Sequence, residues 1–196
     1  MSQVLSTEDA NLIFKEARTY RAWKNTPVSQ GLLTDIYNLC KYGPTSANCS
    51  PMRITFLTTA SGKERLKPHL DPGNVDKTMS APVTAIIAYD LDFYERMDVL
   101  YPHTNAKAWF VGKPDFIKTT AALNSTLQGG YFIIAARSFG LDCGPMTGFN
   151  NDGLDKEFFP DGKTKSVFLC NLGHGDGTNM PPRDPRLSFD EACQIL

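Results

Sequence analysis

The longest helical pattern in the sequence runs from Ile117 to Phe139. Apolar residues such as Leu127 and Ile134 recur at helical spacing within it, and Gly140 supplies a stop signal. The pair Gly129-Gly130 permits close backbone packing or a bend in the middle of this segment. We expect this segment to be the central helix of the core.

Other runs alternate with this helix along the chain. Residues 53–58, 83–89 and 166–172 are rich in β-branched and aromatic side chains and are bounded by turn formers, which predicts three strands. The spacing of apolar residues over 32–40 predicts a helix that ends before Gly43-Pro44. We further expect a helix after a cap at Ser6 or Thr7, a turn over 144–149, and a short helix over 189–195.

Residues 93–114 contain many aromatic side chains without a clean period, which is typical of irregular or short-helical cover over a site. No repeat or linker divides the 196 residues, so we expect one domain, 1–196, of the α+β or α/β class.

Composition excludes several classes of partner. A formal net charge of -1 does not suit a protein that coats nucleic acid or an anionic membrane. The longest apolar run, around 81–89, is far shorter than the roughly 20 residues of a membrane span. Five widely spaced cysteines without metal-ligand spacing favour reduced thiols in a cytoplasmic protein and no metal site.

Three separated segments carry side chains suited to a phosphorylated, planar cofactor. Arg18–Arg21 and Arg183–Arg186 supply guanidinium groups that can bind a phosphate, and Gly43–Pro51 is a loop dense in short donors and acceptors. Each has an ordinary interpretation as well, namely cations at a helix end, a solvated basic loop and a simple connection.

Two smaller features could face the same ligand. In the predicted turn 144–149, Gly148 allows the backbone to approach a flat molecule. Asn74 and Lys77 lie one helical turn apart before the second predicted strand, although such a pair is usually found on the surface.

In this order, the segments resemble the nitroreductase family of FMN-dependent oxidoreductases over essentially the full length. Within the family, the chain is most similar to the subgroup that contains the malonic semialdehyde reductase of pyrimidine degradation. The subgroup resemblance rests on 43–51, 93–96, 144–149 and 185–193.

This resemblance implies an α+β fold with a central, mainly antiparallel sheet flanked by helices, in an intertwined homodimer with FMN at the subunit interface. It implies ping-pong hydride transfer from NADH or NADPH through flavin N5 to a small aldehyde acid, such as malonic semialdehyde, giving 3-hydroxypropionate. No side chain is expected to act as a catalytic nucleophile.

The resemblance also assigns candidate cofactor-binding residues. Near the phosphate and ribityl chain they are Arg18, Thr19, Arg21, Arg183 and Arg186. On the loop that the partner subunit contributes they are Pro44, Thr45, Ser46 and Asn48. At the ring they are Asn74, Lys77, Pro145, Met146, Thr147 and Gly148, with Lys77 expected to raise the reduction potential of the flavin.

Departures from the family pattern leave alternatives open. Ala17 and Pro181 stand where basic residues are frequent, so the phosphate site is less basic than usual. The alternatives are a broad reductase of nitroaromatics, quinones or enals, a flavin-binding module without turnover, and a thiol enzyme that uses Cys49 or Cys143.

Overall fold

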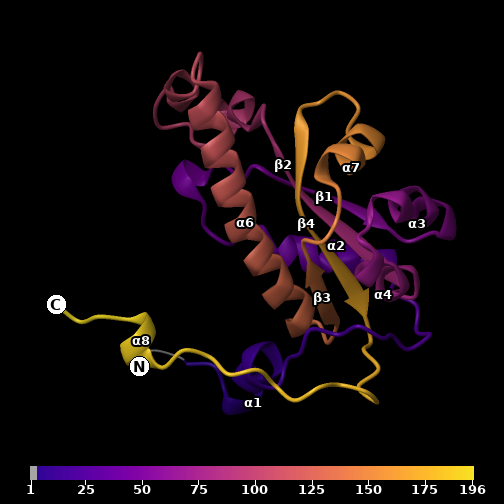
Figure 1. Ribbon diagram of the computed structural model, residues 1–196. Coiled ribbons are helices and arrows are strands. Elements are labelled where there is room, and N and C mark those ends of the chain that lie inside the picture. Colours follow the sequence, from indigo (N-terminus) through magenta and orange to yellow (C-terminus); the bar gives the residue numbers. More distant parts are fainter. Residues whose placement is uncertain (1–3) are drawn as a thin grey trace.

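A four-stranded sheet forms the centre of the molecule in a computed structural model that describes residues 4–196 (Figure 1). Every neighbouring pair of strands is antiparallel, and the order across the sheet is β1-β2-β4-β3. The strands are β1 (Met52–Leu57), β2 (Val83–Asp90), β3 (Asp142–Met146) and β4 (Thr164–Gly173). The predicted antiparallel sheet flanked by helices is therefore confirmed.

One face of the sheet is covered by α6 (Pro114–Ser138) and α2 (Gln30–Cys40), close to the helices predicted from periodicity. The α6 helix crosses the sheet and contacts all four strands. Along β2, Val83, Ala85 and Ile87 point into this layer, because successive side chains of a strand alternate between faces. The main hydrophobic core lies between these helices and the sheet.

The opposite face carries three short helices, α3 (Ala60–Leu66), α4 (Val75–Met79) and α7 (Asn151–Phe158). Ile86 of β2 packs there with Leu66 and Leu154 in a second buried cluster. Helices α3 and α7 were not predicted from the sequence, because each is too short to show a clear period.

A third cluster lies under the segment 93–110, where Phe93, Met97 and Phe110 are buried. This segment forms 3-10 turns at Phe93–Arg96 and Ala106–Trp109 around α5 (Met97–Leu100), so the prediction of short-helical structure here is confirmed. The remaining elements are α1 (Thr7–Ala10), a π-helical turn (Asn11–Lys15), 3-10 turns at Ser46–Asn48, Lys67–His69 and Pro72–Asn74, and α8 (Phe189–Ala192). No helix among residues 4–196 is long and apolar enough to cross a membrane.

The prediction of a turn over 144–149 was wrong for its first half, since Asp142–Met146 is strand β3. Gly144 and Pro145 are turn formers, and this composition concealed the strand. Proline is tolerated in β3 because this strand lies at the edge of the sheet, where a missing N–H need not interrupt a ladder on both sides.

The N-terminal segment 19–24 covers the free edge of β3. The Tyr20 amide donates to the Cys143 carbonyl at 3.1 Å, and the Lys24 amide donates to the His174 carbonyl at 2.8 Å. A Cβ atom added at Gly144 would lie 2.7 Å from the Tyr20 carbonyl oxygen, which is closer than real Cβ contacts allow. Gly144 is therefore required for the close approach of this segment.

Gly144→Ala is expected to destabilise the fold by roughly 1–3 kcal/mol, because the new methyl group must push the Tyr20 backbone away from β3. Gly31→Ala is the matched control, since its Cβ would meet only Ser29 Oγ at 3.8 Å on the exposed side of α2. Urea unfolding measures both variants. Equal stability of the two would contradict the packing described for segment 19–24.

Lys63 is a buried lysine that joins α3 to α4. Its Nζ donates to the Thr78 carbonyl at 3.2 Å, and only 6% of the residue is exposed. Burial disfavours the ammonium form and lowers the pKa of Lys63 to about 8. Between this value and the ordinary lysine pKa, the unfolded chain therefore binds more protons than the folded one.

Because of this difference, the contribution of Lys63 to the free energy of unfolding should rise as the pH increases from about 8 towards the lysine value of roughly 10.4. We expect the wild type to gain more stability than Lys63→Met between pH 7.5 and pH 9.5, measured by urea unfolding. An identical gain in the two proteins would show that Lys63 is not buried as described.

Candidate functional site

Five arginines surround a cavity of about 600 Å³ between the N-terminal segment, the end of α6 and the C-terminal tail, where the tail is residues 178–196. They are Arg18, Arg21, Arg137, Arg183 and Arg186. Asp184 is the only acidic side chain among the lining residues described, and Thr19 adds a hydroxyl. The structure thus brings together the residues that were predicted near the phosphate, namely Arg18, Thr19, Arg21, Arg183 and Arg186.

Two of these arginines hold the tail against the N-terminal segment. Arg18 Nη2 donates to the Pro181 carbonyl at 2.5 Å, and Arg183 Nη2 donates to the Ala17 carbonyl at 2.8 Å. A guanidinium group has five N–H donors, so each side chain keeps donors for a ligand. Guanidinium groups also match the geometry of phosphate oxygens, which makes the cavity suited to a phosphate monoester.

Arg137 was not predicted as a site residue. It lies in the last turn of α6, and its Nη1 donates to the Ile13 carbonyl at 2.9 Å. In the sequence, it resembles an ordinary cation at a helix C-terminus. Only the packing of the N-terminal helix against α6 places Arg137 at the cavity, where it is a fifth guanidinium group.

A second group of predicted residues meets where β3 ends. Asn74 Nδ2 donates to the Gly148 carbonyl at 2.6 Å, so Asn74 is a packed residue rather than a free surface one. A Cβ atom at Gly148 would lie 2.5 Å from this Nδ2 atom, which explains the glycine. Met146 is buried beside Thr78, Pro145 is half-buried in β3, and Thr147 is exposed.

Lys77 connects the second group to the arginines. Burial, and then the nearby positive charge of Arg21, lower the pKa of the Lys77 ammonium. Its backbone carbonyl accepts hydrogen bonds from Trp23 Nε1 at 2.9 Å and from Asn171 Nδ2 at 3.1 Å, which fixes the end of α4. The Lys77 environment therefore favours an anionic group, because a negative charge would relieve the repulsion from Arg21.

The predicted loop residues lie elsewhere on the molecule. Pro44, Ser46 and Asn48 are exposed, whereas Thr45 is half-buried and its Oγ1 accepts from the Ser50 amide at 3.2 Å. Asn48 Nδ2 donates to the Leu100 carbonyl at 2.8 Å. The loop therefore exposes Pro44, Ser46 and Asn48, while hydrogen bonds such as that of Asn48 fix its path within the chain.

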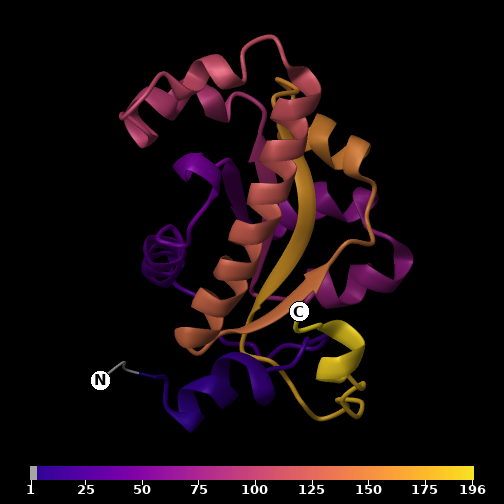
Figure 2. The same cartoon turned by 90° about the vertical axis from the view of Figure 1, so that its left-hand side faces the viewer.

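The 44–51 loop contacts the first half of α6, whereas the N-terminal segment and the tail lie at the end of this helix (Figure 2). The Ser46 amide donates to Asn124 Oδ1, whereas Arg137 lies 13 residues further along the helix. At 1.5 Å per residue this separation is about 20 Å. A single copy of the chain therefore does not bring the loop together with the arginines.

The structure gives no support to a thiol enzyme. Cys49 is fully buried, and burial raises the pKa of its thiol to about 11, so the thiol is protonated at neutral pH. Cys143 is buried in the main core. Among residues 4–196 no group of three or more His, Cys, Asp or Glu side chains is placed to hold a metal ion.

The aromatic residues of the cover pack mainly on one another. The Phe110 ring packs edge-to-face on Phe93 with ring centroids 5.0 Å apart, so Phe110 belongs to the buried cluster of this segment. Trp109 remains 43% exposed, and the ring of His103 contacts Tyr101.

Comparison with known proteins identifies relatives over the whole chain. The model of the nitroreductase family matches residues 14–174. A protein from Polynucleobacter asymbioticus, provisionally named an NADH dehydrogenase/NAD(P)H nitroreductase, is 57% identical over 196 residues, with both chains covered in full. One from Cupriavidus pinatubonensis, with the same provisional name, is 55% identical over 186 residues, which cover 93% of this chain and 95% of the relative.

Solved structures share the fold at low identity. A protein from Exiguobacterium sibiricum, provisionally called a nitroreductase and solved in complex with FMN, matches with a TM-score of 0.85 and 17% identity, with both chains covered in full. An enone reductase of gut-bacterial fatty acid saturation matches with a TM-score of 0.83 and 16% identity, covering 98% of this chain and 100% of the other. The match of the family model and the identity of the relatives show that this chain belongs to the nitroreductase family.

Proposed function

We propose that this protein is an NAD(P)H-dependent FMN oxidoreductase whose site is completed by a second copy of the chain. The observation that carries the proposal is the cavity surrounded by five arginines, one of which, Arg21, lies close enough to Lys77 to lower the pKa of its ammonium group. One end of this region suits a phosphate and the other suits the edge of a flat, electron-accepting ring. Family membership and the FMN bound by the Exiguobacterium sibiricum protein support the same cofactor.

The residues present fit FMN at both ends. Arg18, Arg183 and the other guanidinium groups would hold the phosphate, and Thr19 would add a hydroxyl. Asn74 and Lys77 offer polar groups for the pyrimidine edge of the ring, and the absence of a side chain at Gly148 lets Asn74 pack against the backbone there. When bound, FMN supplies the N5 atom that accepts hydride from NADH or NADPH and passes it to the second substrate.

Within this site, Lys77 has an electrostatic task. Its ammonium group would stabilise the negative charge that two-electron reduction adds to the flavin ring. This stabilisation of the reduced form would raise the reduction potential of the flavin. The backbone N–H groups of Thr147 and Gly148 would orient the ring, which is positioning and not acid–base chemistry.

For the acceptor, the resemblance of segments 43–51, 93–96, 144–149 and 185–193 favours a small aldehyde acid such as malonic semialdehyde, reduced to 3-hydroxypropionate. The second candidate is a broad reductase of nitroaromatics, quinones or enals, which the provisional nitroreductase names of the two relatives favour. A site above an exposed ring also discriminates weakly between acceptors.

The test is an anaerobic titration of protein loaded with FMN. NADH or NADPH should bleach the oxidised flavin spectrum, and the acceptor should restore it. The ratio of kcat/KM for malonic semialdehyde to that for a nitroaromatic then decides between the two candidates. A flavin that NADH and NADPH both fail to bleach would overturn the oxidoreductase, and bleaching without reoxidation by any acceptor would favour a flavin-binding module.

Lys77→Met is expected to lower the midpoint potential of the bound flavin, because the positive charge near the reduced ring is lost. A tenfold loss of preference for the reduced form corresponds to about 30 mV for a two-electron couple. Lys156→Met, at an exposed lysine of α7, is the control and should leave the potential unchanged. Dye-equilibration potentiometry measures both. An unchanged potential in Lys77→Met would remove Lys77 from the ring site.

A homodimer is supported by apolar side chains that the single chain leaves exposed. Leu123 and Leu127 are 66% and 45% exposed on the face of α6 that points away from the sheet, and Ile134 continues the same stripe. On the neighbouring helix α2, Leu39 is 47% exposed. Exposed apolar side chains gathered along one face of a helix are typical of a protein interface. A second copy placed here could bring its loop to the arginines of the first.

Leu127→Asp should convert the dimer into monomers and abolish FMN retention, because a carboxylate would be buried without a partner in the interface. Val111→Asp is the control, since Val111 is 56% exposed on the cover and away from the stripe. Sedimentation velocity and the flavin content after gel filtration give the result. A monomeric wild type that retains FMN would contradict the dimeric site.

A further inference from the structure

The loop between Pro44 and Pro51 has a strained backbone. Ala47, Asn48 and Ser50 have φ angles of 48°, 53° and 41°, in the left-handed region that side chains other than glycine disfavour. Three such residues within four positions persist only where the surroundings impose the conformation. The contacts that impose it are therefore informative about the loop.

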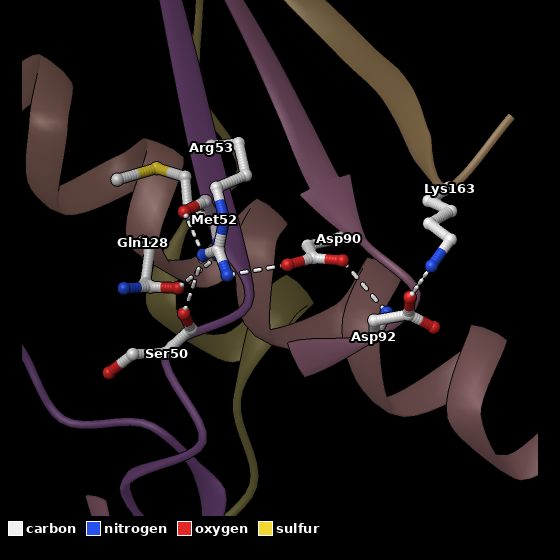
Figure 3. Close-up of polar contacts among 7 residues, drawn as sticks. All are labelled: Ser50, Met52, Arg53, Asp90, Asp92, Gln128 and Lys163. Atoms are coloured by element: carbon white, nitrogen blue, oxygen red, sulfur yellow. Dashed lines mark hydrogen bonds and ion pairs between the residues drawn. The ribbon is translucent and has the colours of Figure 1, made fainter. Parts of the chain in front are cut away.

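Two buried amides of α6 hold the ends of the strained stretch. Asn124 Oδ1 accepts from the Ser46 amide at 2.8 Å, before the first strained residue. Gln128 Oε1 accepts from the Met52 amide at 3.0 Å, just after the last one (Figure 3). Asn124 and Gln128 are 2% and 4% exposed and lie one turn apart on the helix. Burial of two amides in this position is costly unless they make such hydrogen bonds.

A third side chain holds the strained residue Ser50 itself. Arg53 Nη1 donates to the Ser50 carbonyl at 3.2 Å and to the Met52 carbonyl at 2.9 Å. Its Nη2 donates to Asp90 Oδ2 at 2.6 Å, and Asp90 Oδ1 accepts from the Asp92 amide at 2.8 Å. Figure 3 shows this guanidinium group between the loop and the end of β2, so the Ser50 carbonyl is anchored to the central sheet.

We propose that Asn124, Gln128 and Arg53 are positioning residues that hold the loop in its strained form so that Pro44, Ser46 and Asn48 are presented to the cofactor. We call these three side chains the loop clamp. The inference rests on the proposed FMN site, but it concerns residues outside the predicted cofactor contacts. Each clamp bond lies within one chain, so the loop is ordered before it meets a ligand.

Preorganisation has a measurable consequence for affinity. Where the clamp holds, FMN binding does not have to order the loop, and the conformational cost is met during folding. Where the clamp is weakened, the loop relaxes into ordinary backbone conformations, and the apparent affinity falls with the fraction of competent loop. A purely structural role for the same hydrogen bonds would change thermal stability and leave FMN affinity unchanged.

The experiment compares variants of the full-length protein by FMN fluorescence titration and by hydrogen–deuterium exchange of residues 44–52 without FMN. Asn124→Leu should weaken FMN binding at least tenfold and speed exchange in the loop. Arg53→Lys is the second variant if Asn124→Leu does not fold. It keeps the positive charge beside Asp90 but loses the guanidinium group that donates to Ser50, Met52 and Asp90 together.

A rescue separates positioning from structure. Adding Ala47→Gly to Asn124→Leu should recover most of the lost FMN affinity, because glycine adopts a positive φ without strain. Asn151→Leu is the matched control, since its Nδ2 donates from α7 to the Ser166 carbonyl at 3.1 Å and lies outside the clamp. This variant should lose stability without losing FMN affinity.

The clamp is overturned if Asn124→Leu and Arg53→Lys bind FMN as the wild type does, or if loop exchange is unchanged in both. A wild type that binds no FMN would overturn the proposed function instead. In that case loop exchange alone decides on the clamp, and faster exchange in both variants would support it.

Discussion

The packing of α6 across the sheet is the constraint on which the other parts of the site depend. Its buried face forms the main core with α2 and the strands. The polar positions Asn124 and Gln128 on that face hold the 44–51 loop, and Arg137 at its end joins the arginines. One rigid helix thus forms the core, holds the loop and carries one of the arginines. The distance along α6 between Asn124, which holds the loop, and Arg137 is therefore fixed at about 20 Å in a single chain.

This separation gives the proposed dimer a physical reason. The stripe that includes Leu123 and Leu127 lies on the face of α6 opposite to the core, so a second copy can pack there without disturbing the sheet. Two copies would then build two sites, each with arginines from one chain and a loop from the other. Loss of the dimer would therefore remove cofactor binding as well as an apolar contact.

Much of the fold could be predicted from the sequence because the signals were local. The periodicity of 117–139 and the β-branched run 83–89 are carried by the residues that form α6 and β2. Strand β3 was missed because Gly144 and Pro145 are also turn formers, and only its place at the sheet edge explains them. Short helices such as α7 lack the length that a periodic signal requires.

For the candidate site, the sequence could indicate residue types but not their tertiary partners. The grouping of Arg18 with Arg183 followed from resemblance, and the structure brings the two together. Arg137 and Asn124 were missed because a helix-end cation and a buried amide have ordinary explanations until the packing is known. Ala47 and Ser50 have positive φ angles although neither is a glycine, and only Asn48 is a residue type that favours this conformation, so the sequence carries little signal of the strain.

The most direct test of a site shared between two chains uses two defective variants in one dimer. Arg21→Glu removes charge from the phosphate half, and Ser46→Trp blocks the loop half, so neither homodimer should bind FMN. Co-expressed heterodimers, isolated by two affinity tags, should bind one FMN per dimer, because one of their two sites contains both intact halves. Heterodimers that bind no FMN, with wild-type dimers that bind two, would contradict a site built from both chains.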